Sequence, residues 1–364
     1  MKRVSITTIA RELGVSTTTV HRALNGDARI SDFTRQRVLE VAHQLGYRPN
    51  QNARGLRLSR THTIGAIVTG ISSTFYARIL DGIENAARKS GYGVLLGCSH
   101  DSPQKEQEQI ELLLERQVDG LIIAPADPAA SIQHYLQLVH EGVPLVFVGR
   151  HVPGVPVQSV ETNNVSGGYL VGQHLCNIGR RNIAIVTTIA SKRQYSYVHE
   201  RIHGCLEAVQ QFGNATAQVI GEDILETMPL PDFAYRAVSQ HIQKGGMLDA
   251  IFAINDDLAY GAIGALLDLG LHVPEEVSVV GFNDEAMSAY FRPPLTTVRT
   301  AVCQIGSEAV RLLVEAIEGA QQPVAARRIL LMPELVVRGS CGARLPIAVQ
   351  DNSNQPKPKE GDPL

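Results

Sequence analysis

Four polar side chains near the N-terminus have the types and the spacing needed to read DNA bases. They are Thr17, Thr18, His21 and Arg22. At 3.6 residues per turn these positions share one face of a short helix, where hydroxyl, imidazole and guanidinium groups present donors and acceptors. A helix lying in the major groove needs such a face, because each base pair displays its own pattern of donors and acceptors there. The alternative is a small helical hairpin whose polar face is only solvated.

A second group with recognisable chemistry is His199-Glu200-Arg201-Ile202-His203. Two histidines four residues apart, followed after the first by a glutamate, match the zinc-protease pattern, in which the histidines bind the metal and the glutamate acts as base. No third ligand follows at a typical spacing, and a chain with 12 histidines can contain this motif by chance. We therefore expect no metal, no cofactor and no enzyme, and a zinc metalloprotease is the remote alternative.

The residues around the N-terminal polar face predict a helix-turn-helix. Apolar residues at helical spacing give the two helices facing sides: Ile9, Ala10 and Leu13 in the first, and Val15, Val20, Ala23 and Leu24 in the second. The turn Leu13-Gly14-Val15 is too short for an ordinary loop. Ser16 is a suitable N-cap, because its hydroxyl can accept a free amide of the next turn.

A third helix is predicted to begin after Ser31 and to end at Gly46. Its apolar stripe consists of Phe33, Val38, Val41, Ala42 and Leu45. The short basic segment that follows is marginal as an isolated helix, and Gly55 lowers its helicity by about 1 kcal/mol relative to Ala. Two interpretations remain open for it: a helix that folds with DNA and a partner chain, or a flexible linker.

Charge is divided unevenly along the chain. Residues 1–60 hold eleven Lys and Arg against four acids, a balance of +7, whereas the rest of the chain holds 22 basic and 32 acidic side chains, a balance of −10. A basic segment on an acidic body is typical of a phosphate-binding module joined to a regulatory domain.

Five scattered cysteines without a Cys-x-x-Cys pair indicate reduced thiols in the cytosol. No apolar run is long enough for a membrane span or a signal peptide.

The body alternates strand and helix patterns. Nine candidate strands, the last of them Ile329–Leu335, predict parallel sheets covered on both faces, and their number favours two lobes. Ligands bind outside the carboxyl ends of such strands, where this chain places Thr69, Ser72, Ser73, Phe75, Asp101, Asp127, Arg150, Asn255, Asp256, Asn283 and Asp284. Polar groups with one or two rings suit a polyhydroxylated ligand. For each residue, a role as a loop cap or turn residue is the alternative.

Three motifs resemble the lac repressor (LacI/GalR) family of bacterial transcription regulators. They are Val15-Ser-Thr-Thr-Thr-Val-x-Arg22-x-Leu-Asn25, Ser31-x-x-Thr34-Arg35 and Gly46-Tyr-x-Pro-Asn50-x-x-Ala53-Arg54-x-Leu56. The resemblance implies that Thr17, Thr18 and Arg22 reach bases, while His21 stands where a Ser is usual. It implies phosphate contacts by Ser5, Ser16, Asn25, Ser31 and Thr34. It also implies a DNA-binding hinge helix over Asn50–Leu56, including Ala53 and Arg54, in which Leu56 is a wedge between base pairs of the minor groove.

The resemblance also implies a domain plan. A helix-turn-helix head over residues 1–49 and a hinge helix or linker over 50–59 precede a core over 60–342, which resembles periplasmic sugar-binding proteins with two doubly wound lobes. Crossings between the lobes near Asn163, Phe291 and Pro323 would give an N-lobe of about 60–163 and 292–323 and a C-lobe of about 164–291 and 324–342. The tail 343–364 is rich in Pro, Asn, Lys and acids, which predicts disorder.

The resemblance narrows the ligand-binding residues. Arg201, in Arg201-x-x-Gly204, matches the arginine with which the family grips its ligand. The complete predicted set is Ser72, Ser73, Phe75, Tyr76, Asp127, Arg150, Arg201, Asn255, Asp256 and Asn283. Gly149 and Asn283 stand where the family often has acids. The loss of two carboxylates predicts a neutral or positive pocket, with room for a sugar acid or a phosphorylated ligand.

Together these observations favour a ligand-responsive transcription regulator, a cytoplasmic, nucleoid-associated repressor of a carbohydrate or related catabolic operon. The expected partners are pseudo-palindromic double-stranded operator DNA, a sugar or sugar derivative as effector, and a second copy of the chain, without membrane contact. A dimer is expected rather than a tetramer, because the tail lacks leucine heptads. A solute-binding protein of a transport system would fit the body alone, but the basic head argues against it.

Overall fold

The computed structural model describes residues 4–47, 60–127, 129–188, 196–221, 228–319 and 326–343. The chain divides into two compact units, residues 1–61 and 62–364. The predicted hinge helix over Asn50–Leu56 lies outside the described residues, as does the predicted disordered tail beyond Ala343.

The first unit is a bundle of three short helices, Ile6–Leu13 (α1), Thr17–Leu24 (α2) and Asp32–Gln44 (α3). Serines cap all three: the hydroxyls of Ser5, Ser16 and Ser31 each accept a hydrogen bond from a backbone N–H of the first turn. Gly14 turns the chain from α1 into α2 with a φ of +66°, which favours glycine. The predicted helix-turn-helix is confirmed.

One residue of the predicted core of this unit is misplaced. Phe33, assigned to the apolar stripe of α3, is 71% exposed. It lies in the first turn of α3 and points outward, where the guanidinium of Arg37 covers its ring at 5.8 Å. The stripe instead buries Val38 and Ala42 against Ile9 and Val20.

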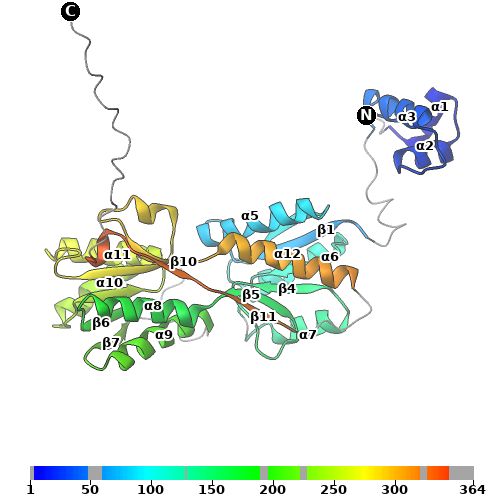
Figure 1. The fold of residues 1–364 in the computed structure, drawn as a ribbon. Helices are drawn as coiled ribbons and strands as arrows, with labels where there is room; N and C mark the ends of the chain where they lie inside the picture. The colour runs from blue at the N-terminus through cyan, green and yellow to red at the C-terminus, as the bar shows by residue number, and fades with distance from the viewer. Residues whose placement is uncertain are drawn as a thin grey trace, which may run out of the picture. The chain divides into compact units, whose positions relative to one another are not determined.

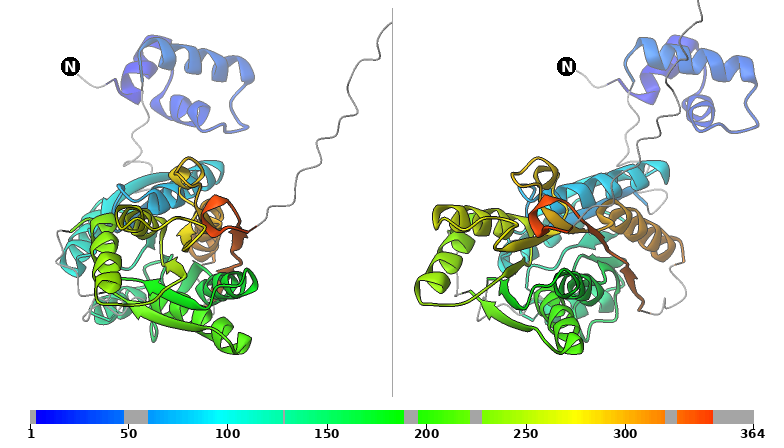
Figure 2. Two further views of the ribbon diagram at one scale, coloured as in Figure 1. Left: turned by 90° about the vertical axis from the view of Figure 1, so that its left-hand side faces the viewer. Right: turned by 60° about the vertical axis from the view of Figure 1, so that its left-hand side comes forward.

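The second unit contains two lobes, each with a six-stranded sheet (Figure 1). The N-lobe sheet comprises Thr63–Val68 (β1), Gly93–Cys98 (β2), Leu121–Ile123 (β3), Leu145–Val148 (β4), Gln158–Thr162 (β5) and Arg328–Leu331 (β11), in the order β11-β5-β4-β3-β1-β2. Its helices are Thr74–Lys89 (α5), Pro103–Glu115 (α6), Ile132–His140 (α7) and Val302–Glu318 (α12). Although α12 comes late in the sequence, it packs beside α5 (Figure 2).

The C-lobe repeats this topology. Its sheet comprises Asn182–Val186 (β6), Thr216–Ile220 (β7), Ala250–Ala253 (β8), Ser278–Asn283 (β9), Thr296–Arg299 (β10) and Glu334–Val336 (β12), in the order β12-β10-β9-β8-β6-β7. The helices are Asn164–Asn177 (α8), Ser196–Phe212 (α9), Leu230–Gln243 (α10) and Asp256–Asp268 (α11), with short 3₁₀ turns at Ala286–Ala289 (η1) and Gly339–Cys341 (η2). Strands pair in parallel in both sheets, except for the antiparallel pair β10–β12. The prediction of two doubly wound lobes is confirmed.

Two of the three predicted crossings between the lobes were misplaced. The first lies at Asn163, between β5 and α8, as predicted. The second does not lie near Phe291, because β10 still pairs with β9 in the C-lobe and the chain returns to the N-lobe only between Arg299 and α12. The third lies at Met332–Pro333 and not near Pro323. The single strand predicted over Ile329–Leu335 is therefore two strands, β11 and β12, in different sheets.

Candidate effector pocket and DNA-reading face

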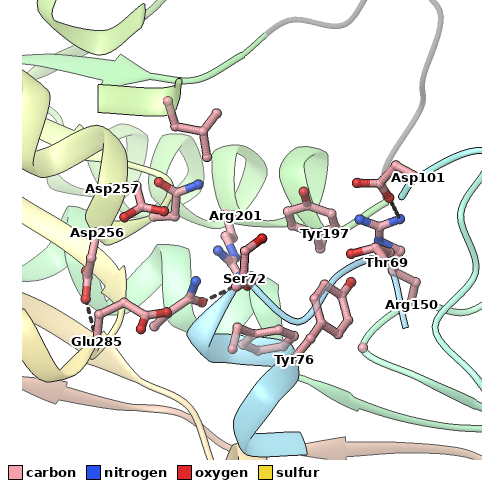
Figure 3. Close-up of a pocket in the computed structure, with 16 residues that line it drawn as sticks. Thr69, Ser72, Tyr76, Asp101, Arg150, Tyr197, Arg201, Asp256, Asp257 and Glu285 are labelled. Carbon is pink, nitrogen blue, oxygen red and sulfur yellow. Dashed lines mark hydrogen bonds and ion pairs between the residues drawn. The ribbon is translucent and has the colours of Figure 1, made fainter. Parts of the chain in front are cut away.

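A cleft of about 340 Å³ lies between the lobes, at the carboxyl ends of their strands (Figure 3). Its lining comprises Thr69, Ser72, Ser73, Phe75, Tyr76, Asp101, Gly149, Arg150, Tyr197, Arg201, Leu230, Asn255, Asp256, Asp257, Asn283 and Glu285. Nine of the ten predicted ligand residues are therefore brought together here. The exception is Asp127, whose carboxylate instead accepts hydrogen bonds from the amides of Ala129 and Ala130 and so caps a turn.

Arg201 is the central cation of the cleft, and only 5% of its surface is exposed. Its guanidinium donates to the side-chain oxygen of Asn164 at 2.9 Å, to the carbonyl of Ile254 at 2.6 Å and to the side-chain oxygen of Asn283 at 3.4 Å. The ring of Phe282 lies 3.6 Å from its central carbon. Burial lowers the pKa of Arg201 to about 10, so the group remains charged at neutral pH. Its partners fix its direction without cancelling its charge.

Arg150 enters the cleft from the opposite lobe. It donates to the carboxylate of Asp101 at 2.9 Å and to the carbonyls of Pro125 and Ala126. The ring of Tyr197 lies 5.5 Å from the guanidinium carbon of Arg150 and 5.2 Å from that of Arg201. One aromatic side chain of the C-lobe thus contacts a cation from each lobe, at distances typical of cation–π attraction.

Two rings at the start of α5 form the N-lobe wall. Phe75 and Tyr76 meet edge to face at 5.1 Å, and burial raises the pKa of Tyr76 to about 12, so its hydroxyl stays protonated. Gly149 lies against both rings: a Cβ there would be 3.5 Å from Phe75, and its φ of +70° favours glycine. At this position the wall therefore offers apolar surface and no acid.

Asp256 is fully buried at the base of the C-lobe side. Its two oxygens accept hydrogen bonds from the hydroxyls of Thr297 and Ser288 and from the amide of Glu285. Burial raises the pKa of Asp256 to about 7, although these three hydrogen bonds lower it in part. The carboxyl therefore holds the loop after β9 in place, and its oxygens are engaged by the protein itself.

The loops that carry two polar lining residues adopt unusual backbone conformations. Asn283 has a φ of +111° and the adjacent Asp284 a φ of +54°, at the end of β9. Asp101 has a φ of +54° at the end of β2. Such conformations cost on the order of 1 kcal/mol for non-glycine residues, and they cluster where a loop must aim a side chain. Here the loop after β9 places Asn283 at the cleft, and the loop after β2 places Asp101 there.

Five lining residues were not in the predicted set and not among the predicted strand ends: Gly149, Tyr197, Leu230, Asp257 and Glu285. Burial raises the pKa of Glu285, and Thr74 at the start of α5 lowers it in part. With Asp101 and Asp256, the lining holds four acids against two arginines. The prediction of a neutral or positive pocket missed two acids, Asp257 in the first turn of α11 and Glu285 in the loop after β9, which offset the two lost carboxylates in the formal count.

The predicted DNA-reading residues lie on and around α2. Thr17 and Thr18 are exposed, and His21 and Arg22 are half-buried. The amide of Asn25 donates to the carbonyl of His21 at 2.8 Å and lies 3.2 Å from its ring. The serines predicted to contact phosphates are the N-caps of the three helices: Ser5, Ser16 and Ser31. The hydroxyl oxygens of Ser31 and Thr34 lie 3.0 Å apart.

Asp27 organises the arginines beside this face. It accepts two hydrogen bonds from Arg29, at 2.9 and 2.8 Å, and lies 3.8 Å from Arg22. The hydrogen bonds from Arg29 lower the pKa of Asp27 to about 2. At neutral pH the carboxylate is ionised and draws Arg22 toward the end of α2.

The zinc-protease motif is not assembled as a metal site. His199 and His203 are exposed, while Glu200 is held by Arg328 and Asn164. Within the described ranges, no group of three His, Cys, Asp or Glu side chains is placed to hold a metal ion. Among the described helices, none combines the length and apolar character needed to cross a lipid bilayer.

The fold and the two candidate sites define a class, a DNA-binding transcription regulator with a periplasmic-binding-protein-like sensor core. Residues 5–50 match the model of bacterial regulatory proteins of the lacI family, and residues 173–341 match the periplasmic binding protein-like domain. The chain is 33% identical to the HTH-type transcriptional regulator DegA of Bacillus subtilis over 345 residues, covering 93% of this chain and 98% of that protein. It is 31% identical to the HTH-type transcriptional repressor PurR of Haemophilus influenzae over 342 residues, covering 92% and 98%.

A solved structure agrees with these relatives. The lac repressor dimer bound to operator and the anti-inducer ONPF superimposes with a TM-score of 0.82 at 25% identity, covering 94% of this chain and all of that one. The chain belongs to the LacI family of bacterial regulatory proteins. Its relatives are transcription regulators, which confirms the prediction that it is not an enzyme.

Proposed function

We propose that this protein is a dimeric repressor that binds pseudo-palindromic operator DNA and releases or holds it in response to a sugar-like effector. The observation that carries the proposal is the joining, in one chain, of a helix with an exposed donor–acceptor face to a two-lobed cleft built around a buried arginine. An effector that binds one lobe arrangement better than the other shifts the population of the two, and so changes operator affinity. Acting on operator DNA, the protein works in the cytoplasm, at the nucleoid.

The cleft favours a neutral polyhydroxylated effector, a sugar or sugar derivative. Acceptors on Asp257 and Glu285 and donors on Arg201 suit hydroxyl groups, and the rings of Phe75 and Tyr76 offer apolar faces. Arg150 is already balanced by Asp101, so the effector need not bring a negative charge. Regulation of a carbohydrate or related catabolic operon follows from this effector class.

A thermal-shift screen with sugars, polyols, sugar acids and nucleosides, followed by calorimetry, tests the effector class. A neutral sugar or polyol should raise the melting temperature, and its binding should be lost in Arg201→Ala. Binding of a nucleoside or of a sugar acid alone would overturn the neutral-sugar assignment. The experiment is independent of DNA, so it separates effector binding from operator recognition.

On the DNA side, we propose that Thr17, Thr18, His21 and Arg22 read bases, with phosphate contacts from the serine caps and a wedge at Leu56. Selection of operators from random DNA should yield an inverted repeat. Leu56→Ala should weaken operator binding and reduce DNA bending without changing effector affinity, because an apolar wedge acts only on the duplex. Unchanged operator affinity would refute the wedge. A chain that binds a sugar but no DNA sequence would instead fit a solute-binding protein.

The edges of the two core sheets support a homodimer. On the edge strand β2, Leu95 and Leu96 are 39% and 48% exposed, and on the edge strand β7, Val219 is 38% exposed. An unpaired strand edge can pair with another chain, and exposed apolar side chains on it favour such a contact. Leu96→Arg should therefore shift sedimentation to the monomer and weaken operator binding. The matched control is Leu112→Arg on α6, 43% exposed in the wild type, which should leave the dimer intact.

A further inference from the structure

An ion-pair network around a buried glutamate lies at the junction of the lobes, outside both the cleft and the DNA-reading face. Glu161 of β5 is fully buried. It accepts hydrogen bonds from Arg328, at 3.0 and 3.3 Å, and from the hydroxyl of Ser159 at 2.9 Å, and His151 Nδ1 lies 3.2 Å from it. Burial alone would raise the pKa of Glu161, but hydrogen bonds from His151 and Arg328 hold it below its usual value. All four residues belong to the N-lobe.

Arg328 extends this network into the C-lobe. Its Nη2 donates to Glu200 Oε1 at 2.7 Å, and Glu200 lies on α9. The side chains of Arg328 and Glu200 are 37% and 20% exposed, so solvent and salt screen their attraction in part. Arg328 stands at the start of β11, the strand that precedes the third crossing at Met332–Pro333. The ion pair therefore joins the lobes close to the segments about which they would rotate.

Asn164 links this ion pair to the cleft. It follows the first crossing and is 98% buried, with 2% exposure. Its amide donates to Glu200 Oε2 at 3.3 Å, and its oxygen accepts from Arg201 Nε at 2.9 Å. Glu200 and Arg201 are neighbours on α9, so one side chain holds both the ion pair and the central cation of the cleft. A displacement of Arg201 would therefore disturb Asn164 and the hydrogen bond that Asn164 donates to Glu200.

We propose that Glu200, Asn164 and Arg328 form a clasp across the lobe junction, which sets the angle between the lobes and couples it to Arg201. The proposal rests on the proposed function in one respect, that the effector binds at Arg201. Rotation of the C-lobe about the crossings would move α9 relative to β11 and so disturb the Glu200–Arg328 pair, which is at 2.7 Å in the present arrangement. The clasp therefore stabilises one lobe arrangement and resists the other.

Hydrogen–deuterium exchange of the full chain without ligand tests the clasp. Glu200→Gln removes the negative charge that faces Arg328 and leaves the buried Glu161 paired, so the protein should fold. Exchange in peptides spanning residues 159–168 and 328–336 should rise about three- to tenfold, because the backbone bond from Asn163 to Leu331 opens with the junction. The control is Glu308→Gln, which breaks an ion pair with Arg311 inside the N-lobe and should change neither peptide. Unchanged exchange in Glu200→Gln would overturn the clasp.

Two further measurements test the coupling. Arg201→Lys keeps the charge but removes the Nε donor to Asn164, so it should raise exchange in the same two peptides; no rise would overturn the link to Arg201. Glu200→Gln should also change operator affinity at least threefold in the absence of any effector, as measured by fluorescence anisotropy. If the wild type binds operator and exchange rises while affinity stays the same, the clasp is structural only and the coupling is refuted. If the wild type binds no operator, the proposed function fails, and the exchange results still decide the clasp.

Discussion

The close packing of α8 against α9 makes a single added methyl group a sharp test of the C-lobe side of the cleft. A Cβ at Gly168 would lie 2.0 Å from the backbone oxygen of Arg201, and a Cβ at Gly204 would lie 2.0 Å from that of Val165. Both atoms encountered are backbone atoms, so no rotamer change can relieve the clash. Gly168→Ala must therefore separate the two helices and displace the residue that carries the central guanidinium.

The magnitude follows from two opposing effects. Ordinary contact begins at 3.4 Å, so the atoms must move apart by about 1.4 Å. Overpacking usually costs up to about 3 kcal/mol. We take this upper value because the clashing atom belongs to the backbone and cannot move by a rotamer change. Alanine in place of glycine within a helix returns about 1 kcal/mol. We expect Gly168→Ala to lower the free energy of unfolding by about 2 kcal/mol and to weaken effector binding about tenfold.

Urea unfolding and calorimetry measure the two effects, and α11 supplies the matched control. A Cβ at Gly264 meets only a side-chain carbon of Tyr235 at 3.7 Å, an ordinary contact. Gly264→Ala should therefore raise the free energy of unfolding by about 1 kcal/mol and leave effector binding unchanged. The same Gly→Ala substitution should thus lower the free energy of unfolding on α8 and raise it on α11. A Gly168→Ala protein as stable as the wild type, with the same effector affinity, would refute the packing argument.

Three further outcomes are expected. Arg22→Gln should weaken operator binding about 10- to 100-fold and relax base preference, measured by anisotropy on single-base operator variants, with Arg88→Gln on α5 as a neutral control. Tyr197→Leu removes two cation–π contacts and should weaken effector binding about tenfold in calorimetry; unchanged affinity would contradict it. Burial raises the pKa of Glu106 to about 7 from 4.5, so the folded state binds the proton more tightly than the unfolded state. Wild-type stability should therefore fall relative to Glu106→Gln as the pH rises from 4.5 to 7, and parallel pH profiles in urea unfolding would contradict this.

The head and the strand ends could be predicted because their signals are local. A cap such as Ser16 and the turn at Gly14 act within a few residues, so the sequence around them is sufficient. Likewise, Arg150 and Asn255 directly follow apolar strands, and the carboxyl ends of parallel strands must meet at the cleft. This physical constraint brought nine of the eleven predicted strand-end residues to the cleft without any knowledge of side-chain geometry.

The misses have non-local causes. Strand β5, Gln158–Thr162, lacks an apolar pattern because its buried Glu161 is balanced by Arg328, 167 residues away. The second crossing was misplaced because only the pairing with β9 shows that β10 belongs to the C-lobe. Tyr197 follows no predicted strand, and Glu285 lies one residue beyond the predicted strand end at Asp284; both reach the cleft through the packing of the lobes. Local sequence patterns cannot predict a contact between residues that only the tertiary structure brings together.

The placement of the last two strands has a consequence for biosynthesis. The N-lobe sheet is completed at its edge by β11, residues 328–331, and the C-lobe sheet by β12, residues 334–336. A ribosome makes the three helices of the head first, and these can fold as a unit while the rest is still being translated. Both lobes, by contrast, wait for almost the whole chain. A chain that ends between α12 and residue 328 therefore yields a DNA-reading head joined to two lobes that each lack an edge strand.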